Sequence, residues 1–244
     1  MSKTKCLLST GTFFRISKDM NEAINYANQF NIDGVELGFL FFEELENTVL
    51  DQETISILKK FNYNSFHAPG DKKIRYKDNE FFNKIVKKIK KLASLTNCRN
   101  ITIHAEQIED FNFVISTFSG DFNLCIENVR PKDGFDNDKL IELLINNPKL
   151  YFTFDTAHAM EFSIDEFKNL YKKMKHKVKQ IHLSLTHNNR FHNFVNNCPN
   201  NTFIEALEII KDSKCPIVIE AGLRDGFDKE LIEKEIKFVK TFFN

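Results

Sequence analysis

The chain has 244 residues, of which 42% are hydrophobic and 28% are charged. This length fits one domain in the size range of α/β barrels, and this composition excludes a disordered chain. The 34 Lys and Arg residues balance 34 Asp and Glu residues, which excludes an overall positive field that would attract nucleic acid or an anionic membrane. The balanced net charge does not exclude a local groove lined by basic residues.

Short apolar runs alternate with longer stretches of helical periodicity along the whole chain, which is the pattern of repeated β-α units. Eight segments are predicted strands, and several are nearly continuous hydrophobic runs, as buried parallel strands are. They are Lys5–Thr10, Gly34–Leu37, Asn64–His67, Ile101–His104, Leu124–Asn128, Tyr151–Asp155, Gln180–Ser184 and Pro216–Glu220. Eight such units predict a (β/α)8 TIM barrel, with residues 1–244 forming one α/β domain.

Helices are predicted between these strands. They are Met20–Phe30, Glu53–Phe61, Glu80–Thr96, Asp138–Asn146, Ile164–Lys175, Phe203–Lys211 and Lys229–Phe243. Helix-capping patterns support several of the starts. The predicted caps are Asp51, Asp78, Ser163 with Glu166, and Thr202 with Glu205. The segment Ala105–Phe122 is short and is broken at Ser119-Gly120, so we expect a shortened helix there.

No stretch, including Met1–Leu8, is apolar over the length needed to cross a bilayer. The five cysteines are odd in number and contain no CxxC pair, which fits a reduced compartment. Cys6 and Cys125 fall in predicted strands, where a free thiol behaves as a small core hydrophobe. We therefore expect a cytoplasmic protein without a membrane partner.

Six of the seven histidines fall at or just after the end of a predicted strand. They are His67, His104, His158, His182, His187 and His192. Glu127, Asp155 and Glu220 occupy equivalent positions, and these strand ends meet at the barrel mouth, where this fold has its active sites. One such histidine alone is more often a structural residue, but a ring of imidazoles and carboxylates suits zinc, manganese, cobalt or magnesium. The sequence therefore predicts a divalent-metal site.

At these residues the chain resembles the xylose isomerase-like barrel superfamily, which includes sugar isomerases, sugar epimerases and the endonuclease IV type of DNA repair enzyme. The matching segments are Phe66-His67-Ala68-Pro69, Ile103-His104, Ile126-Glu127-Asn128, Asp155-Thr156-Ala157-His158, Ile181-His182-Leu183-Ser184 and Ile219-Glu220. Each motif is short, but the six span most of the chain in the expected order.

The resemblance to the single-metal epimerases implies one set of metal ligands and one set of substrate contacts. The implied ligands of zinc or manganese, with magnesium or cobalt as alternatives, are Glu127, Asp155, His182 and Glu220. The expected substrate contacts are His158, Arg190, His192 and Glu36, the last with a structural role as its alternative. Glu127 and Glu220 would be the catalytic pair, exchanging protons with a small sugar or sugar phosphate through an enediolate.

The endonuclease IV type is the alternative, a zinc-dependent phosphodiester hydrolase that acts on abasic DNA. The resemblance implies three zinc ions, with His67 and His104 as further ligands. Arg190 stands where that type has an aspartate, so His158 and His192 alone would hold the third ion poorly. Only under this alternative is DNA a partner.

Three further points stay open. The apolar segment Phe39–Phe42 is a sugar-pocket wall, a dimer contact that would make the chain a homo-oligomer, or the first turn of a helix. The basic residues near the mouth bind a substrate phosphate or are solvated loop charges. They are Lys72, Lys73, Arg75, Arg130 and Arg224. A third hypothesis is a barrel that binds a ligand or partner without catalysing a reaction. We interpret His187 as a loop residue.

Overall fold

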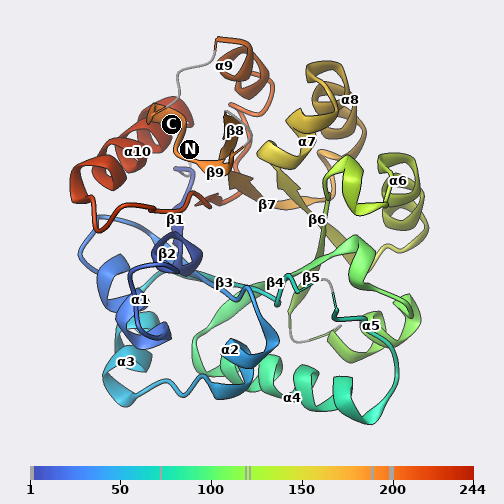
Figure 1. Ribbon diagram of the computed structural model, residues 1–244. Helices are drawn as coiled ribbons and strands as arrows, with labels where there is room; N and C mark the ends of the chain where they lie inside the picture. The colour runs from blue at the N-terminus through green and yellow to red at the C-terminus, as the bar shows by residue number, and fades with distance from the viewer. Residues whose placement is uncertain (1–2, 72, 119, 121, 188–189, 198–200) are drawn as a thin grey trace.

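The structure is a computed structural model and describes residues 3–71, 73–118, 120, 122–187, 190–197 and 201–244. Eight parallel strands close into a barrel in the order β1-β10-β7-β6-β5-β4-β3-β2, with helices around it (Figure 1). They are β1 (Cys6–Ser9), β2 (Gly34–Gly38), β3 (Tyr63–His67), β4 (Cys98–His104), β5 (Asn123–Glu127), β6 (Leu150–Asp155), β7 (Val178–Leu183) and β10 (Ile217–Ile219). The predicted (β/α)8 barrel is confirmed.

The outer ring contains every predicted helix, with ends shifted by a few residues. The helices are α1 (Met20–Ala27), α2 (Phe42–Asn47), α3 (Gln52–Lys60), α4 (Glu80–Leu95), α5 (Phe111–Phe118), α6 (Asn137–Asn146), α7 (Thr156–Phe162), α8 (Ile164–Met174), α9 (Asn201–Leu207) and α10 (Lys229–Phe242). The expected shortened helix is α5, of 8 residues. Ser119, at the predicted break, and Lys72 lie outside the described residues.

Two of the four predicted caps are confirmed. The side chains of Asp51 and Ser163 each accept a hydrogen bond from the backbone N–H three residues later. Asp78 was the wrong choice, because the neighbouring Asn79 caps α4. Thr202 was also wrong, because α9 already begins at Asn201. In Asp78-Asn79 both residue types cap well, so the sequence did not distinguish the two.

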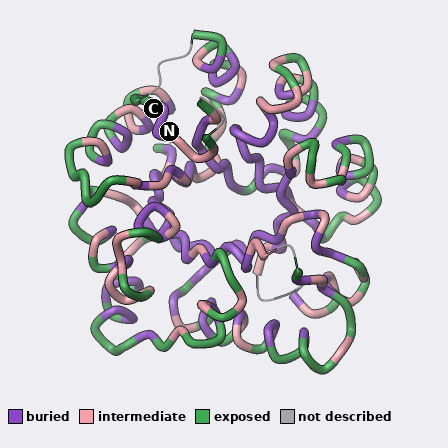
Figure 2. Tube along the Cα trace, in the orientation of Figure 1, coloured by how far each residue is buried: buried purple, intermediate pink, exposed green. Residues whose placement is uncertain are grey.

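The register of the parallel strands brings the predicted site residues together. His104 pairs with Glu127 across β4 and β5, and Asp155 pairs with His182 across β6 and β7. Buried residues line the inner ring of the molecule, whereas exposed residues lie on the outer faces of the helices (Figure 2). The barrel and the helices that cover it therefore form a rigid frame around one mouth.

Several short elements near the mouth are not among the predicted helices and strands, although a helix start at Phe39–Phe42 was one of the alternatives. The helices α2 and α7 follow β2 and β6 closely, and β8 (Leu185–His187) pairs with β9 (Arg190–Asn193) as an antiparallel hairpin after β7. None of the helices in the described part of the chain combines the length and the apolar character needed for a membrane span.

Candidate metal centre and cavity

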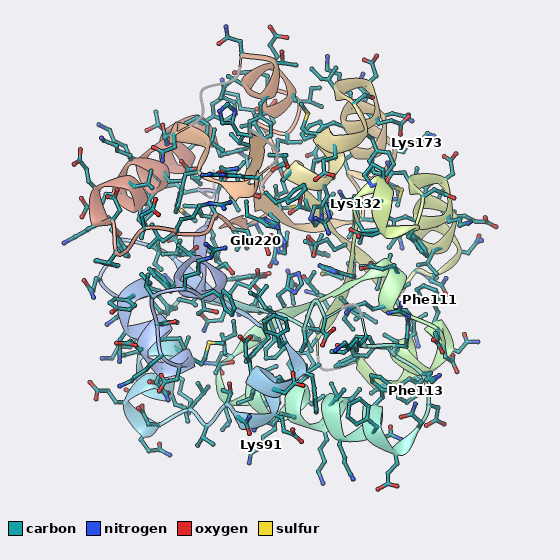
Figure 3. All side chains as sticks on the ribbon, in the orientation of Figure 1. Lys91, Phe111, Phe113, Lys132, Lys173 and Glu220 are labelled. Atoms are coloured by element: carbon teal, nitrogen blue, oxygen red, sulfur yellow. The ribbon has the colours of Figure 1, made fainter. Side chains whose placement is uncertain are left out.

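Four donor side chains converge at the barrel mouth. Glu127 ends β5, Asp155 ends β6, His182 lies near the end of β7, and Glu220 follows β10. One ligand atom from each of these four residues lies within 4.8 Å of the others. Glu220 lies inside the ring of helices, whereas Lys91 and Lys173 lie on the outer helices (Figure 3). This four-donor group consists of the four residues that the family resemblance implied as metal ligands.

The geometry of the four-donor group suits a cation. Nδ1 of His182 lies 3.2 Å from Oε1 of Glu127 and 3.0 Å from Oε2 of Glu220. Oδ1 of Asp155 accepts the backbone N–H of His158 at 2.6 Å. Its other oxygen, Oδ2, is buried and has no hydrogen-bond partner among the described residues. A buried carboxylate oxygen without a partner is costly, and a bound cation would satisfy it.

A second donor group shares Glu127 with the first. Nε2 of His67 lies 2.9 Å from Oε2 of Glu127, and Nε2 of His104 lies 3.5 Å from the same oxygen. These three residues also satisfy the spacing for a metal ion. Glu127 therefore directs Oε1 toward His182 and Oε2 toward His67 and His104, so each of its two oxygens faces a different donor group.

The protonation states of this centre are strongly perturbed. Burial alone raises the pKa of Glu127, but the charges of His182 and His67 outweigh it and hold that pKa well below the usual value. Burial lowers the pKa of His67, but Glu127 raises it to about 9 in total. The pKa of His182 is also raised well above its usual value, because Glu36, Glu220 and Glu127 outweigh burial. Two imidazolium ions therefore balance the carboxylates.

The pKa of Asp155 is shifted in the opposite direction to that of Glu127. Burial raises the pKa of Asp155 well above the usual value, and the charges of Glu127 and Glu220 raise it further. Burial also lowers the pKa of His158, which keeps this imidazole neutral. The raised pKa values of Asp155, His67 and His182 favour protons on these groups in the metal-free centre, and divalent cations would displace them.

A cavity of about 240 Å³ lies above the two donor groups. The predicted residues that line it are His67, His104, His158, His192 and Glu220. Phe39 and Leu40 form part of its wall, while α2 begins at Phe42, so the apolar segment is both a pocket wall and a helix start. This cavity is of a size that encloses a small molecule.

Two predicted substrate contacts are placed elsewhere. Arg190 is exposed on β9 and lines a separate cavity of about 790 Å³, together with His187 and Arg224. Glu36 is fully buried and hydrogen-bonds inside the barrel, so it does not line the mouth cavity. Neither residue lines the mouth cavity, and for Glu36 the hydrogen bonds favour the structural role that was its alternative. Arg190 is exposed on the hairpin, and Glu36 lies two residues before the end of β2, one layer below the mouth.

The third donor group of the endonuclease IV type is incomplete. The rings of His158 and His192 lie 5.6 Å apart, and Nδ1 of His192 lies 3.1 Å from Oγ of Ser184. Arg190 supplies no metal-ligand atom, and the described residues contain no third group of donors around these two histidines.

The cavity wall also contains residues that the sequence did not single out as a unit. Arg130 donates to Asp133 at 2.8 Å and lies over the ring of Phe191, 4.7 Å from its centroid. The ammonium of Lys132 lies 4.4 Å from the same centroid. The spacing of Arg130 and Asp133 was visible in the sequence, but Phe191 reaches them only because β8 and β9 form a hairpin.

The chain has the barrel fold of solved structures from the xylose isomerase-like superfamily, as the sequence motifs predicted. No family model matches the sequence, and no curated protein matches it. Among solved structures, a D-tagatose 3-epimerase-like protein has a TM-score of 0.67 and 19% identity, covering 98% of this chain and 97% of that chain.

Two further structures show the same likeness. Endonuclease IV from Thermus thermophilus has a TM-score of 0.64 and 11% identity, covering 98% of both chains. A xylose isomerase domain protein from Alicyclobacillus acidocaldarius has a TM-score of 0.60 and 14% identity, covering 98% of this chain and 96% of that chain. At these identities the likeness establishes the fold and leaves the reaction to the site.

Proposed function

We propose that the protein is a divalent-metal-dependent isomerase or epimerase of a small sugar or sugar phosphate. The observation that carries this proposal is the four-donor group, which contains Glu127 and Glu220 and of which Glu220 lines a cavity of about 240 Å³. The buried oxygen of Asp155 without a partner supports the presence of a cation. Such a cation, zinc or manganese, would polarise substrate oxygens and acidify the neighbouring C–H.

The residues around the cavity suggest how the two glutamates take part. Glu220 lines the cavity, and its side chain is 21% exposed, so its carboxylate can reach a substrate directly. The side chain of Glu127 is only 1% exposed, but His67 lines the cavity and contacts Oε2 of Glu127 at 2.9 Å. We therefore assign proton exchange on one side to Glu220 and on the other to the His67–Glu127 pair.

Deuterium incorporation tests this assignment. Keto sugars and their phosphates are incubated with the metal-loaded protein in D2O, and products are analysed by NMR. We expect one deuterium at the epimerised or isomerised carbon, because an enediolate exchanges its proton with solvent. Glu220→Gln should abolish incorporation, and bound metal is measured in the same sample because Glu220 is also a proposed ligand. Glu208→Gln, at an exposed turn residue just after α9, is the matched control. Substrate binding without any incorporation, unchanged by Glu220→Gln, would instead support a barrel that binds without turnover.

A second function is favoured by the second donor group. His67 and His104 converge on Oε2 of Glu127, and a two-metal centre of this kind is typical of phosphoester hydrolases. The alternative is therefore a hydrolase of the endonuclease IV type that acts on abasic DNA.

Metal stoichiometry separates the two functions. Protein purified without a chelator is analysed for bound metal, and the wild type is compared with the His67→Ala, His104→Ala double variant. One ion per chain that survives the double change supports the isomerase. Two ions, one of them lost in the variant, favour the hydrolase and direct the next assay to cleavage of abasic DNA.

A further inference from the structure

A chain of hydrogen-bonded polar side chains runs through the barrel interior to the metal centre. Nδ2 of Asn123 donates to Oδ1 of Asn100 at 2.9 Å, and Nδ2 of Asn100 donates to Oε1 of Gln180 at 3.4 Å. Nε2 of Gln180 donates to Oε2 of Glu36 at 2.5 Å. The same oxygen of Glu36 lies 3.2 Å from Nε2 of His182. Bulky branched apolar side chains usually fill barrels of this type, so this polar chain needs an explanation.

Glu36 is the charged member of this chain. Its side chain is fully buried, and Oε2 also accepts the hydroxyl of Ser65 at 2.9 Å. Its other oxygen, Oε1, has no hydrogen-bond partner in the described part of the structure. A buried carboxylate is a poor source of stability, because well-packed apolar residues in the same space usually stabilise a fold as well or better. A function at the centre explains Glu36 better than stability does.

The two ring nitrogens of His182 face different partners. Nε2 lies 2.8 Å from Nε2 of Gln180 and 3.2 Å from Oε2 of Glu36, whereas Nδ1 faces Glu127 and Glu220 in the four-donor group. A neutral imidazole carries one N–H, and its other nitrogen offers the lone pair that binds metal. The amide nitrogen of Gln180 cannot accept a proton, so a proton on Nε2 of His182 is accepted by Oε2 of Glu36. The lone pair then lies on Nδ1, directed at the other donors.

We propose that Glu36 is a positioning residue that fixes the tautomer and the ring orientation of His182 for a divalent cation. This inference rests on the proposed metal-dependent function and replaces the substrate contact that the sequence suggested for Glu36. Carboxylates that hold a metal-binding histidine in this way typically change metal affinity by roughly ten- to a hundredfold when they are replaced.

The test is the Kd of Zn²⁺ for the wild type, Glu36→Gln and Ser65→Ala, measured by competition with a chromophoric chelator. We expect Zn²⁺ binding to weaken by roughly ten- to a hundredfold in Glu36→Gln. Ser65→Ala is the matched control, because it removes a hydrogen bond to the same oxygen of Glu36 without touching His182, so its Kd should stay near that of the wild type. Thermal unfolding of each variant reports on the fold.

A measurement on the wild type covers the case in which Glu36→Gln does not fold. Long-range proton–nitrogen NMR of the Zn²⁺-loaded protein should show the His182 proton on Nε2 and the metal on Nδ1. A proton on Nδ1, or an unchanged Kd in folded Glu36→Gln, would overturn the inference alone. A wild type that binds no Zn²⁺ would overturn the proposed function together with the inference.

Discussion

Binding of a divalent ion to the four-donor group should release about two protons at neutral pH, because ligands must be deprotonated. Burial and the neighbouring carboxylates raise the pKa of Asp155, so this group is protonated before the ion binds. The pKa of His182 is raised well above its usual value, because Glu36, Glu220 and Glu127 together outweigh burial, so His182 also carries an extra proton. Glu127 and Glu220 have lowered pKa values and lose none.

The number of protons released determines how the Kd of the metal changes with pH. Lowering the pH favours the protonated, metal-free centre, so affinity falls in acid and rises toward alkaline pH. Each proton released contributes a factor of ten per pH unit, or about 1.4 kcal/mol, so the Kd should change about a hundredfold per unit. Calorimetric titration with Mn²⁺ between roughly pH 6 and 8, in buffers of different ionisation enthalpy, measures both the Kd and the proton count.

Two variants test whether the protons come from the residues named. His182→Gln removes one of the two protons, so the slope should fall to about tenfold per pH unit. His176→Gln changes an exposed histidine outside the site and should leave the slope at the wild-type value. A Kd that does not change with pH, or a proton count that is the same in His182→Gln, would refute the assigned protonation states.

Three other changes test the fold and the site. Phe154 is fully buried with its ring 4.9 Å from that of Phe167, so Phe154→Ala should cost about 3–5 kcal/mol in urea denaturation, far more than Phe81→Ala at a half-exposed site. Asp51→Ala should cost about 1 kcal/mol because it removes a helix cap, whereas Asp78→Ala should be neutral. Arg190→Ala should leave kcat/KM unchanged, and a large loss would restore Arg190 as a substrate contact.

The barrel was predictable because its strands are apolar runs and its long helices have clear periodicity. The helix α7 was missed, and α2 was anticipated only as one of three alternatives for Phe39–Phe42, because six or seven residues are too few to establish a helical period. The β8–β9 hairpin was missed for a different reason. Its strands of 3 and 4 residues are mostly polar and pair only with each other, so the sequence there reads as a loop.

The donor ring was predictable because parallel strands bring their last residues to one rim. Glu127 and Asp155 each end a strand, and the structure places them together. Glu36 looked equivalent in the sequence, but β2 continues through Leu37 to Gly38, which leaves Glu36 in a lower layer. The depth of a side chain in a barrel depends on where its strand stops relative to its neighbours, and this is set by the register and not by the local sequence.

The two candidate functions require different protonation states of the His67 nitrogen that faces Oε2 of Glu127. Its Oε1 faces His182 in the four-donor group, and its Oε2 faces His67 and His104. In the isomerase, His67 must keep a proton that it shares with Oε2 of Glu127. In a two-metal hydrolase, His67 must give up that proton, because the nitrogen facing Oε2 becomes a ligand. The raised pKa of His67, about 9, opposes this loss at neutral pH, so binding of a second ion should strengthen as the pH rises.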